Sequence, residues 1–271
     1  MALTDLQRDI CRLLARRRIE AGESYLAGGS TLNELLGASR LSRDLDLFHD
    51  TEAAVSVSFK SDEALLLSAG FAVATIREAR GFIEAELSRD GSSARIEWSR
   101  DSAFRFFPLV EHSELGLVLH PFDLATNKAL ALVGRLEVRD WVDVIECDRR
   151  LQPFGYLAWA ASGKDPGFSP SFLVDRAARQ GRYSATEVAE LDFAGPHPDA
   201  AELSRRWHVI LDEARRVVEV LPADAVGCCV LGGDLELCRL DSPALEAAVA
   251  AGQLQFHPGR IGGALPTLKP A

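Results

Sequence analysis

The sequence predicts an α+β fold with a mixed first half and a mainly helical second half. Apolar residues recur at helical spacing through the first twenty positions. Residues 71–100 have the pattern of a β-ribbon, with an Asp90-Gly91 turn of the kind that joins antiparallel strands. From Pro121 onward, helical patterns dominate. We therefore expect a core over residues 1–120 and a mainly helical domain, closing a cleft, over residues 121–271.

The first half is expected to alternate helices and strands. A strand over 24–27 runs into Gly28-Gly29-Ser30, and a helix is expected to begin near Thr31. A strand over 40–48 and a helix over about 61–69 follow. Further strands are expected over 71–76, 82–87, 94–98 and 115–119. Arginines close the N-terminal helix, where cations complement the helix dipole, and we interpret them as a solvated helix end: Arg12, Arg16, Arg17 and Arg18.

The second half is expected to be built from helices joined by loops that carry Pro and Gly. The segment from about residue 256 is rich in Gly and Pro, which predicts a loose tail. The expected helices span residues 122–135, 139–150, 171–180, 186–192, 199–220 and 243–251.

Composition narrows the class of protein. The 271-residue chain has a formal net charge of −10, which argues against broad binding to duplex nucleic acid. No run approaches the ~20 apolar residues that cross a bilayer, so no membrane partner is expected. The five scattered cysteines predict buried, reduced thiols. Together with an N-terminus unlike a signal peptide, these features predict a cytoplasmic protein.

Two aspartates carry the first chemical signal. In Asp44-Leu45-Asp46, a strand places both carboxylates on one face, about 6–7 Å apart along the chain. Such a pair favours a cation, and Mg²⁺ is commonly held by one or two carboxylates together with substrate phosphates. The alternative is a pair of surface aspartates neutralised by Arg40 and Arg43.

The preceding glycines strengthen the metal interpretation. Gly28, Gly29 and Ser30 lie where a strand meets a helix, and exposed N–H groups at such a point favour an anion. A phosphate cradle followed by two metal-binding carboxylates suits one reaction: attack on an α-phosphorus with pyrophosphate leaving. We therefore predict an NTP as co-substrate and Mg²⁺ as the cofactor.

A third carboxylate is expected to complete the metal site or to deprotonate the attacking hydroxyl. Glu97 is the candidate, because Ile96 and Trp98 on either side are expected to face the core. Its rivals are Glu84, Glu86 and Asp101.

Two cations in the second half are candidates for contacting the nucleotide. Lys128 lies in an apolar helical stripe, and Arg135 follows two turns later. The alternative is that their stems cover apolar surface while their charges remain in water. Asp140 and Asp143 share a helix face and are expected to pair with Arg135 or Arg139, or to orient Lys128.

These motifs together resemble the AbiEii/AbiGii-type nucleotidyltransferase toxins. The resemblance spans roughly residues 24–146 and rests on Gly28-Gly29-Ser30, on 40–48 and on the run from Asp123 through Lys128 to Asp143. It implies a nucleotidyltransferase-like mixed sheet flanked by helices, with a mainly helical C-terminal domain. It also implies transfer of NMP from an NTP with Mg²⁺ to tRNA or protein, within a toxin–antitoxin system in some members.

By the same resemblance, Gly29 and Ser30 match the phosphate loop, Asp44 and Asp46 the metal ligands, and Lys128 a nucleotide-facing lysine. Glu97 matches the third acid by position. Two alternatives remain open. One is a related enzyme that modifies a cationic, aminoglycoside-like drug, for which an acidic cleft is suitable. The other is a non-catalytic nucleotide-binding module, in which the three carboxylates would not converge.

Overall fold

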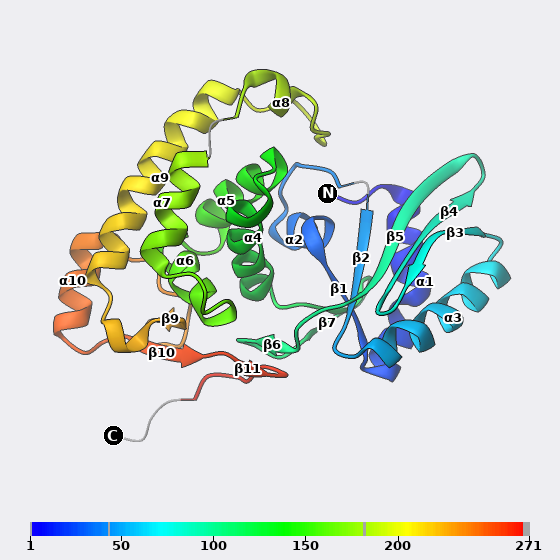
Figure 1. Ribbon diagram of the computed structural model, residues 1–271, viewed down its shortest axis with the longest axis horizontal. Helices are drawn as coiled ribbons and strands as arrows, with labels where there is room; N and C mark the ends of the chain where they lie inside the picture. Colours follow the sequence, from blue (N-terminus) through cyan, green and yellow to red (C-terminus); the bar gives the residue numbers. More distant parts are fainter. Residues whose placement is uncertain (1, 43, 181–182, 268–271) are drawn as a thin grey trace. The chain divides into compact units, whose positions relative to one another are not determined.

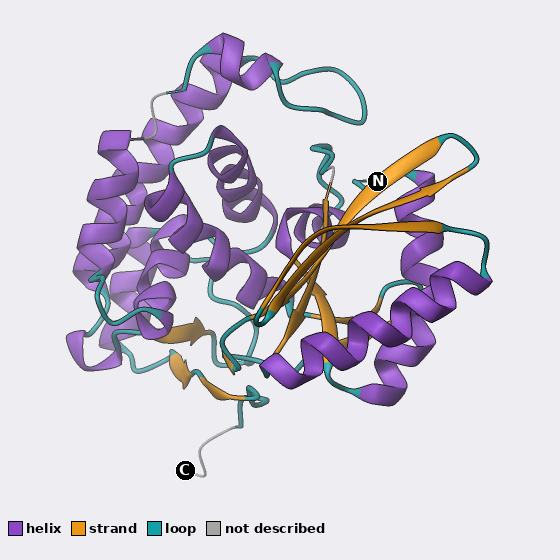
Figure 2. Ribbon diagram, turned by 45° about the vertical axis from the view of Figure 1, so that its right-hand side comes forward, coloured by secondary structure: helices purple, strands orange, loops and turns teal. Residues whose placement is uncertain are grey.

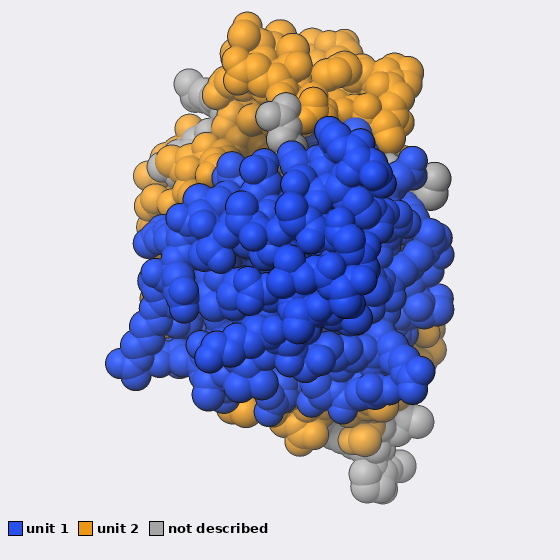
Figure 3. Space-filling view, turned by 90° about the vertical axis from the view of Figure 1, so that its right-hand side faces the viewer, with its two compact units in different colours: residues 1–103, 109–120 blue, residues 104–108, 121–271 orange. Residues whose placement is uncertain are grey.

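The computed structural model describes residues 2–42, 44–180 and 183–267, and the chain divides into two compact units (Figure 1, Figure 3). The first unit comprises residues 1–103 and 109–120, and the second comprises residues 104–108 and 121–271. Residues 104–108 belong to the second unit because Asp123 accepts the backbone N–H groups of Phe106 and Phe107, at 2.9 and 3.1 Å.

The first unit alternates helices and strands, as the sequence indicates. Its helix α1 is closed by a Thr4–Gln7 capping box at one end and by Gly22, in the left-handed region, at the other. The elements are α1 (Asp5–Ala21), β1 (Ser24–Ala27), α2 (Gly28–Leu36), β2 (Asp44–His49), α3 (Glu52–Ser68), β3 (Ala72–Ala79), β4 (Phe82–Arg89), β5 (Ser92–Arg100), β7 (Val110–His112) and β8 (Gly116–Val118).

The sheet of this unit is mixed, which confirms the predicted fold class. Among the described residues it has seven strands in the order β3-β4-β5-β2-β1-β8-β7. The β2–β5 and β1–β8 pairs are parallel, and the others are antiparallel. Asp90 and Gly91, both with positive φ, form the β4–β5 turn that the sequence predicts. This order places β2 next to β5, although the two strands are far apart in the sequence.

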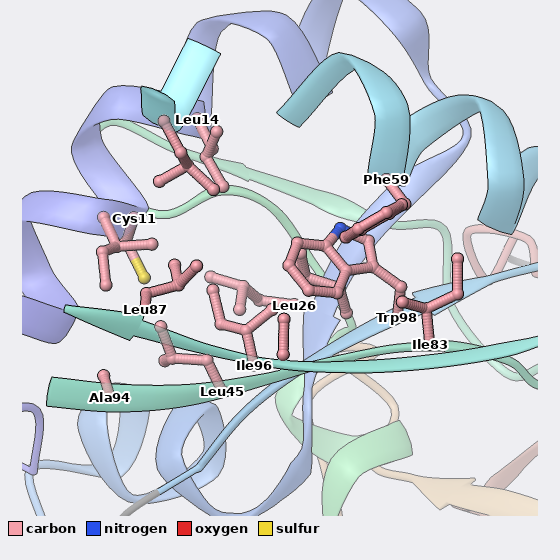
Figure 4. Packing of buried hydrophobic residues seen from close by; sticks show 14 of the residues in the cluster. Cys11, Leu14, Leu26, Leu45, Phe59, Ile83, Leu87, Ala94, Ile96 and Trp98 are labelled. Atoms are coloured by element: carbon pink, nitrogen blue, oxygen red, sulfur yellow. The ribbon is translucent and has the colours of Figure 1, made fainter. Parts of the chain in front are cut away.

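One face of the sheet is covered by α1 and α3, as Figure 2 shows. Leu45, Ile96 and Trp98 point toward these helices and are almost fully buried, and in Figure 4 they lie against side chains of α1 and α3. Phe59 meets Trp98 edge to face at 5.1 Å between ring centroids. This packing leaves the alternate residues of β2 and β5 on the opposite face.

The second unit is mainly helical. The helix α6 runs through its core and is buried from Phe154 to Ala161. Two short antiparallel pairs, β9–β10 and β6–β11, complete the unit. Its elements are β6 (Phe104–Arg105), α4 (Pro121–Arg135), α5 (Val138–Arg150), α6 (Phe154–Lys164), α7 (Pro170–Gln180), α8 (Ala185–Ala189), α9 (Ala200–Val220), a 3₁₀ turn (Ala223–Ala225), β9 (Cys228–Leu231), α10 (Ser242–Ala250), β10 (Gln255–Pro258) and β11 (Arg260–Ile261).

Several expected boundaries are wrong. The helix expected at 61–69 begins at Glu52, because the Thr51 side chain caps it. The strand expected from Arg40 begins at Asp44. The expected loose tail contains β10, which pairs with β9, so the segment from 256 is partly ordered by tertiary contacts.

The arginines of α1 are not uniformly solvated. Arg18 is 2% exposed, and its guanidinium donates to the Leu115 carbonyl at 3.4 Å. Burial lowers the pKa of Arg18, and Asp62 offsets part of that effect. The interpretation of a solvated helix end is therefore wrong at this residue, whereas Arg16 is exposed and pairs with Glu20.

The cysteine prediction is confirmed. All five thiols are free, and every one except Cys228, which is half-buried, is buried. Burial raises the pKa of Cys11 to about 11, and it also raises the pKa of Cys147 and of Cys229. Within the described residues, each helix is too short or too polar to cross a membrane.

Candidate active site

The β1–α2 junction is built around Gly28. This residue has φ +71°, and an ideal Cβ on it would lie 1.6 Å from Asp46 Oδ2. Only glycine fits, because a side chain would be strained by the backbone and would collide with the carboxylate. The helix begins at Gly28 itself, so the expected start near Thr31 is wrong. Gly28, Gly29 and Ser30 are thus the first turn of α2 rather than a loop before it.

The N-terminus of α2 has features that favour binding of an anion. Its N-cap residue, Ala27, has no side chain that could satisfy the first N–H groups. The Ser30 hydroxyl is buried and has no hydrogen-bond partner among the described residues. An unsatisfied buried hydroxyl is costly, and the helix macrodipole favours negative charge at this end. A phosphate oxygen would satisfy both features.

The aspartates of β2 lie on the face predicted from the sequence. Leu45 and Leu47 are buried on one side, while Asp44 and Asp46 alternate with them on the other. Asp46 is opposite Ala27 of β1 on one flank and opposite Glu97 of β5 on the other. The carboxylate of Asp46 is therefore held between the start of α2 and Glu97.

Glu97 faces the same side as the aspartates. Burial raises the pKa of the Glu97 carboxyl, and the charges of Asp46, Asp44 and Glu84 raise it further in that order, against a smaller opposing effect of Arg95. No described residue hydrogen-bonds this carboxylate. Asp44, Asp46 and Glu97 thus share one face of the sheet, and their joint role stays a prediction.

The rival acids differ in their surroundings. Glu84 is opposite Glu97 in register, so acidic residues form a row across β2, β5 and β4, but Glu84 is paired with Arg95 at 3.2 Å. Glu86 is exposed on β4, opposite Arg95. Asp101 lies beyond the end of β5. Of the four, Glu97 is the one beside Asp46.

The donor set suits a hard divalent cation. Hard oxygen ligands at the start of a phosphate cradle are typical of Mg²⁺ sites, where the phosphates supply part of the coordination. No group of three or more His, Cys, Asp or Glu side chains is arranged to hold a metal ion within the described residues. A site that needs only one or two protein carboxylates is compatible with this finding, and metal binding therefore remains a prediction.

Lys128 and Arg135 have carboxylate partners within the second unit. The Lys128 amine is buried and lies 2.7 Å from Asp140 Oδ1 and 3.1 Å from Asp143 Oδ2. The Arg135 guanidinium contacts both oxygens of Asp140, at 2.7 and 3.0 Å. These pairs lower the pKa of Asp140 in spite of its burial. The expected pairing of Asp140 and Asp143 is confirmed, whereas contact of either cation with a nucleotide remains a prediction.

Asp123 is a charged residue whose role the sequence analysis did not assign. Besides accepting two backbone N–H groups, its carboxylate lies 2.8 Å from the Lys164 amine and is fully buried. The partners of Asp123 come from α6 and from residues 104–108, so the sequence around Asp123 does not predict them. Asp123 fastens these segments to α4, which is a structural role.

Comparison with known proteins supports the fold. No family model and no curated protein matches the chain. Among solved structures, it is similar to JHP933 from Helicobacter pylori, with TM-score 0.54 and 15% identity over 80% of this chain and 95% of the other. It is also similar to MenT4, a nucleotidyltransferase toxin from Mycobacterium tuberculosis, with TM-score 0.51 and 17% identity over 81% and 83%. At these identities the likeness shows a shared fold, and the nucleotidyltransferase-like fold predicted from the sequence is confirmed.

Proposed function

We propose that this protein transfers a nucleoside monophosphate from an NTP to an acceptor hydroxyl. The observation that carries the proposal is the placement of Asp46 between Gly28, at the start of α2, and Glu97. A phosphate site and an acidic metal site adjoin there. The fold shared with MenT4, itself a nucleotidyltransferase toxin, supports the same reaction and a role as a toxin.

In the proposed mechanism, the backbone N–H groups of Gly28 and Gly29 and the Ser30 hydroxyl bind the β- and γ-phosphates. Asp44 and Asp46 would hold Mg²⁺, which when bound would neutralise phosphate charge and polarise the α-phosphate. A raised pKa brings Glu97 closer to the range in which a carboxylate accepts a proton from an attacking hydroxyl. The hydroxyl oxygen bonds to the α-phosphorus as the bond to pyrophosphate breaks.

Two classes of acceptor fit the proposed reaction. A tRNA or a protein is expected for a toxin, and an antitoxin would then be its natural partner. The pair formed by Asp46 and Glu97 favours a second candidate, a cationic small molecule such as an aminoglycoside, because adjacent acids in register attract positive charge.

The test is transfer of α-³²P label from each of the four NTPs with Mg²⁺. Total tRNA, cell protein, the enzyme itself and an aminoglycoside are offered as acceptors, to wild type, Asp46→Ala and Glu78→Gln. Glu78 is exposed on β3, so its variant is a matched control for altered charge. We expect label with wild type and Glu78→Gln alone. Equal labelling by Asp46→Ala, or no labelling of any acceptor, would contradict the proposal.

A further inference from the structure

The solvent-facing side of α3 differs from that of its neighbour α1. Both helices have 17 residues and cover the same face of the sheet (Figure 2). The exposed residues of α1 are charged, except Ala21 at its end: Asp5, Asp9, Arg12, Arg16 and Glu20. The exposed residues of α3, which is described in full, are alanines, a valine, a leucine, serines and one charged residue, Lys60. The outer side of α3 is therefore apolar where that of α1 is charged.

Five exposed residues of α3 form one continuous stripe, which we call the α3 stripe. They are Ala53, Val57, Lys60, Ala64 and Leu67. These residues lie alternately four and three positions apart, which is the spacing by which a helix presents one side to a partner helix. Val57 and Leu67 are 61% and 54% exposed, so both would gain free energy by leaving water. Single exposed apolar residues are ordinary, whereas this regular spacing indicates a contact surface.

The α3 stripe has a charge at its centre. Lys60 is its middle residue, and it forms no hydrogen bond or ion pair with any residue that the structure describes. By contrast, exposed arginines of α9 pair with acids three residues earlier, as Arg205 does with Glu202 at 2.7 Å. A partner that covered the stripe would withdraw the Lys60 amine from water. Such a partner must therefore supply a carboxylate.

The alanines define the shape of the partner. Ala53 and Ala64 project only a Cβ, whereas Val57 and Leu67 project further, so larger apolar side chains of a partner can approach the helix at the alanines. The complementary surface thus has apolar residues at the same alternating spacing and one acid opposite Lys60. An amphipathic helix provides such a surface.

A second copy of this chain fits the stripe poorly. The spacing is symmetric about Lys60, so two copies that pack through the whole stripe, in either direction, place Lys60 opposite the same residue of the other copy. Like charges opposed at the centre of an interface are unfavourable. A membrane surface also fits poorly, because helices that lie on membranes carry several cations beside the apolar side and α3 exposes one.

We propose that the α3 stripe docks an amphipathic helix of a different protein, whose carboxylate accepts a hydrogen bond from Lys60. A contact made by one helix is small, so binding is expected to be reversible. The stripe lies on the side of the sheet opposite to Asp46 and Glu97. The proposal therefore does not depend on the transfer reaction.

The probe is a labelled helical peptide of about three heptads, with Leu at the apolar heptad positions and Glu at the central one. A twin peptide carries Lys in place of that Glu. Because the stripe is symmetric about Lys60, either direction of the peptide fits. Binding to the full chain is measured by fluorescence anisotropy. We expect the wild type to bind the Glu peptide at least about tenfold more tightly than the Lys peptide.

Lys60→Glu should reverse this preference, which a contact made only by apolar residues would not do. Leu67→Ser should weaken binding of the Glu peptide about tenfold, because an apolar side chain leaves the interface. Its Tm should stay close to that of wild type, since Leu67 is exposed in the free protein. Arg16→Glu is the matched control on α1 and should bind as wild type does, as should Asp46→Ala.

The proposal is overturned if neither peptide binds, or if Lys60→Glu keeps the preference of the wild type. Sedimentation of the free protein gives an independent check, for which we expect no dimer held by the stripe. A dimer that Leu67→Ser dissociates would assign the stripe to a second copy of this chain and would likewise overturn the proposal.

Discussion

Two groups of charged side chains differ in how their charge is balanced. In the first unit, Asp46 and Glu97 lie side by side in the sheet, and the pKa of Glu97 is raised. In the second unit, Lys128 and Arg135 surround Asp140, whose pKa is lowered. The charges of Asp46 and Asp44 raise the pKa of Glu97, whereas the cations Arg135 and Lys128 lower that of Asp140. We therefore expect substitutions in the first group to affect mainly activity and substitutions of Asp140 to affect mainly stability.

The comparison is tested most strongly by removing Asp46. We expect Asp46→Ala to lower NMP transfer by about 10³-fold or more, because metal-held charge stabilises the transition state by several kcal/mol. Its Tm should fall less than that of Asp140→Asn, since the loss of the Asp46 charge also removes a repulsion on Glu97. Label transfer and thermal unfolding check this, and a large fall in Tm would mean that Asp46 is structural.

Asp140→Asn should lower the stability of the protein more than Asp46→Ala does. It leaves Lys128 buried with one fewer carboxylate, and we expect a loss of about 3 kcal/mol in the free energy of unfolding at pH 7. The folded pKa of Asp140 is lowered, so its stabilisation is present above the unfolded pKa and is lost as the pH falls through the folded pKa.

Urea unfolding of Asp140→Asn at neutral and acidic pH measures both effects, and the difference from wild type should shrink in acid. Glu137→Gln is the control, since Glu137 precedes the same helix and forms a partly exposed ion pair with Arg139. Equal stabilities for Asp140→Asn and Glu137→Gln would show that the ion pairs of Asp140 do not stabilise the second unit.

Gly28→Ala should be more damaging than Gly22→Ala. The two glycines have nearly the same φ, +71° and +70°, but a Cβ at Gly22 meets nothing within 4 Å. Backbone strain of about 1–2 kcal/mol is common to both variants, whereas only Gly28→Ala displaces the Asp46 carboxylate. Transfer should therefore be lost in Gly28→Ala alone. Equal activity of the two variants would show that the close approach of Gly28 to Asp46 has no part in the reaction.

The smallest expected effect is on stability in Glu97→Gln. Relieving a cross-strand repulsion is worth about 0.5 kcal/mol, or roughly 1–2 °C in Tm, at pH 7. The raised pKa of Glu97 means that its contribution to stability is full below the unfolded pKa and is lost as the pH rises through the folded pKa. The gain from Gln should therefore disappear as the pH falls below the unfolded pKa of Glu97, as thermal unfolding across pH would show.

The candidate site was predictable because it depends on local patterns. Alternation along β2 and β5 fixed which side chains face the core, and therefore that Glu97 shares the face of Asp44 and Asp46. The register that sets Glu97 opposite Asp46 is a long-range pairing, and the sequence suggested it only through the resemblance.

Other parts of the fold depend on tertiary contacts that the sequence does not display. The helix α6 is buried on all sides and contains two glycines, so it shows no amphipathic stripe. The pairing of β9 with β10 joins segments separated by a whole helix. The acidic partners of Lys128 lie on the next helix, so the sequence alone left open whether the amine meets a carboxylate or a phosphate.

The buried thiols make the opening of each unit measurable. A thiol reacts as its thiolate and only where a reagent can reach it. In the folded protein, Cys11 of the first unit and Cys147 of the second are buried, and their pKa values are raised, so neither reacts readily. Their alkylation rates at neutral pH would therefore report how often each unit opens. Cys228, which is half-buried, would react first and set the baseline.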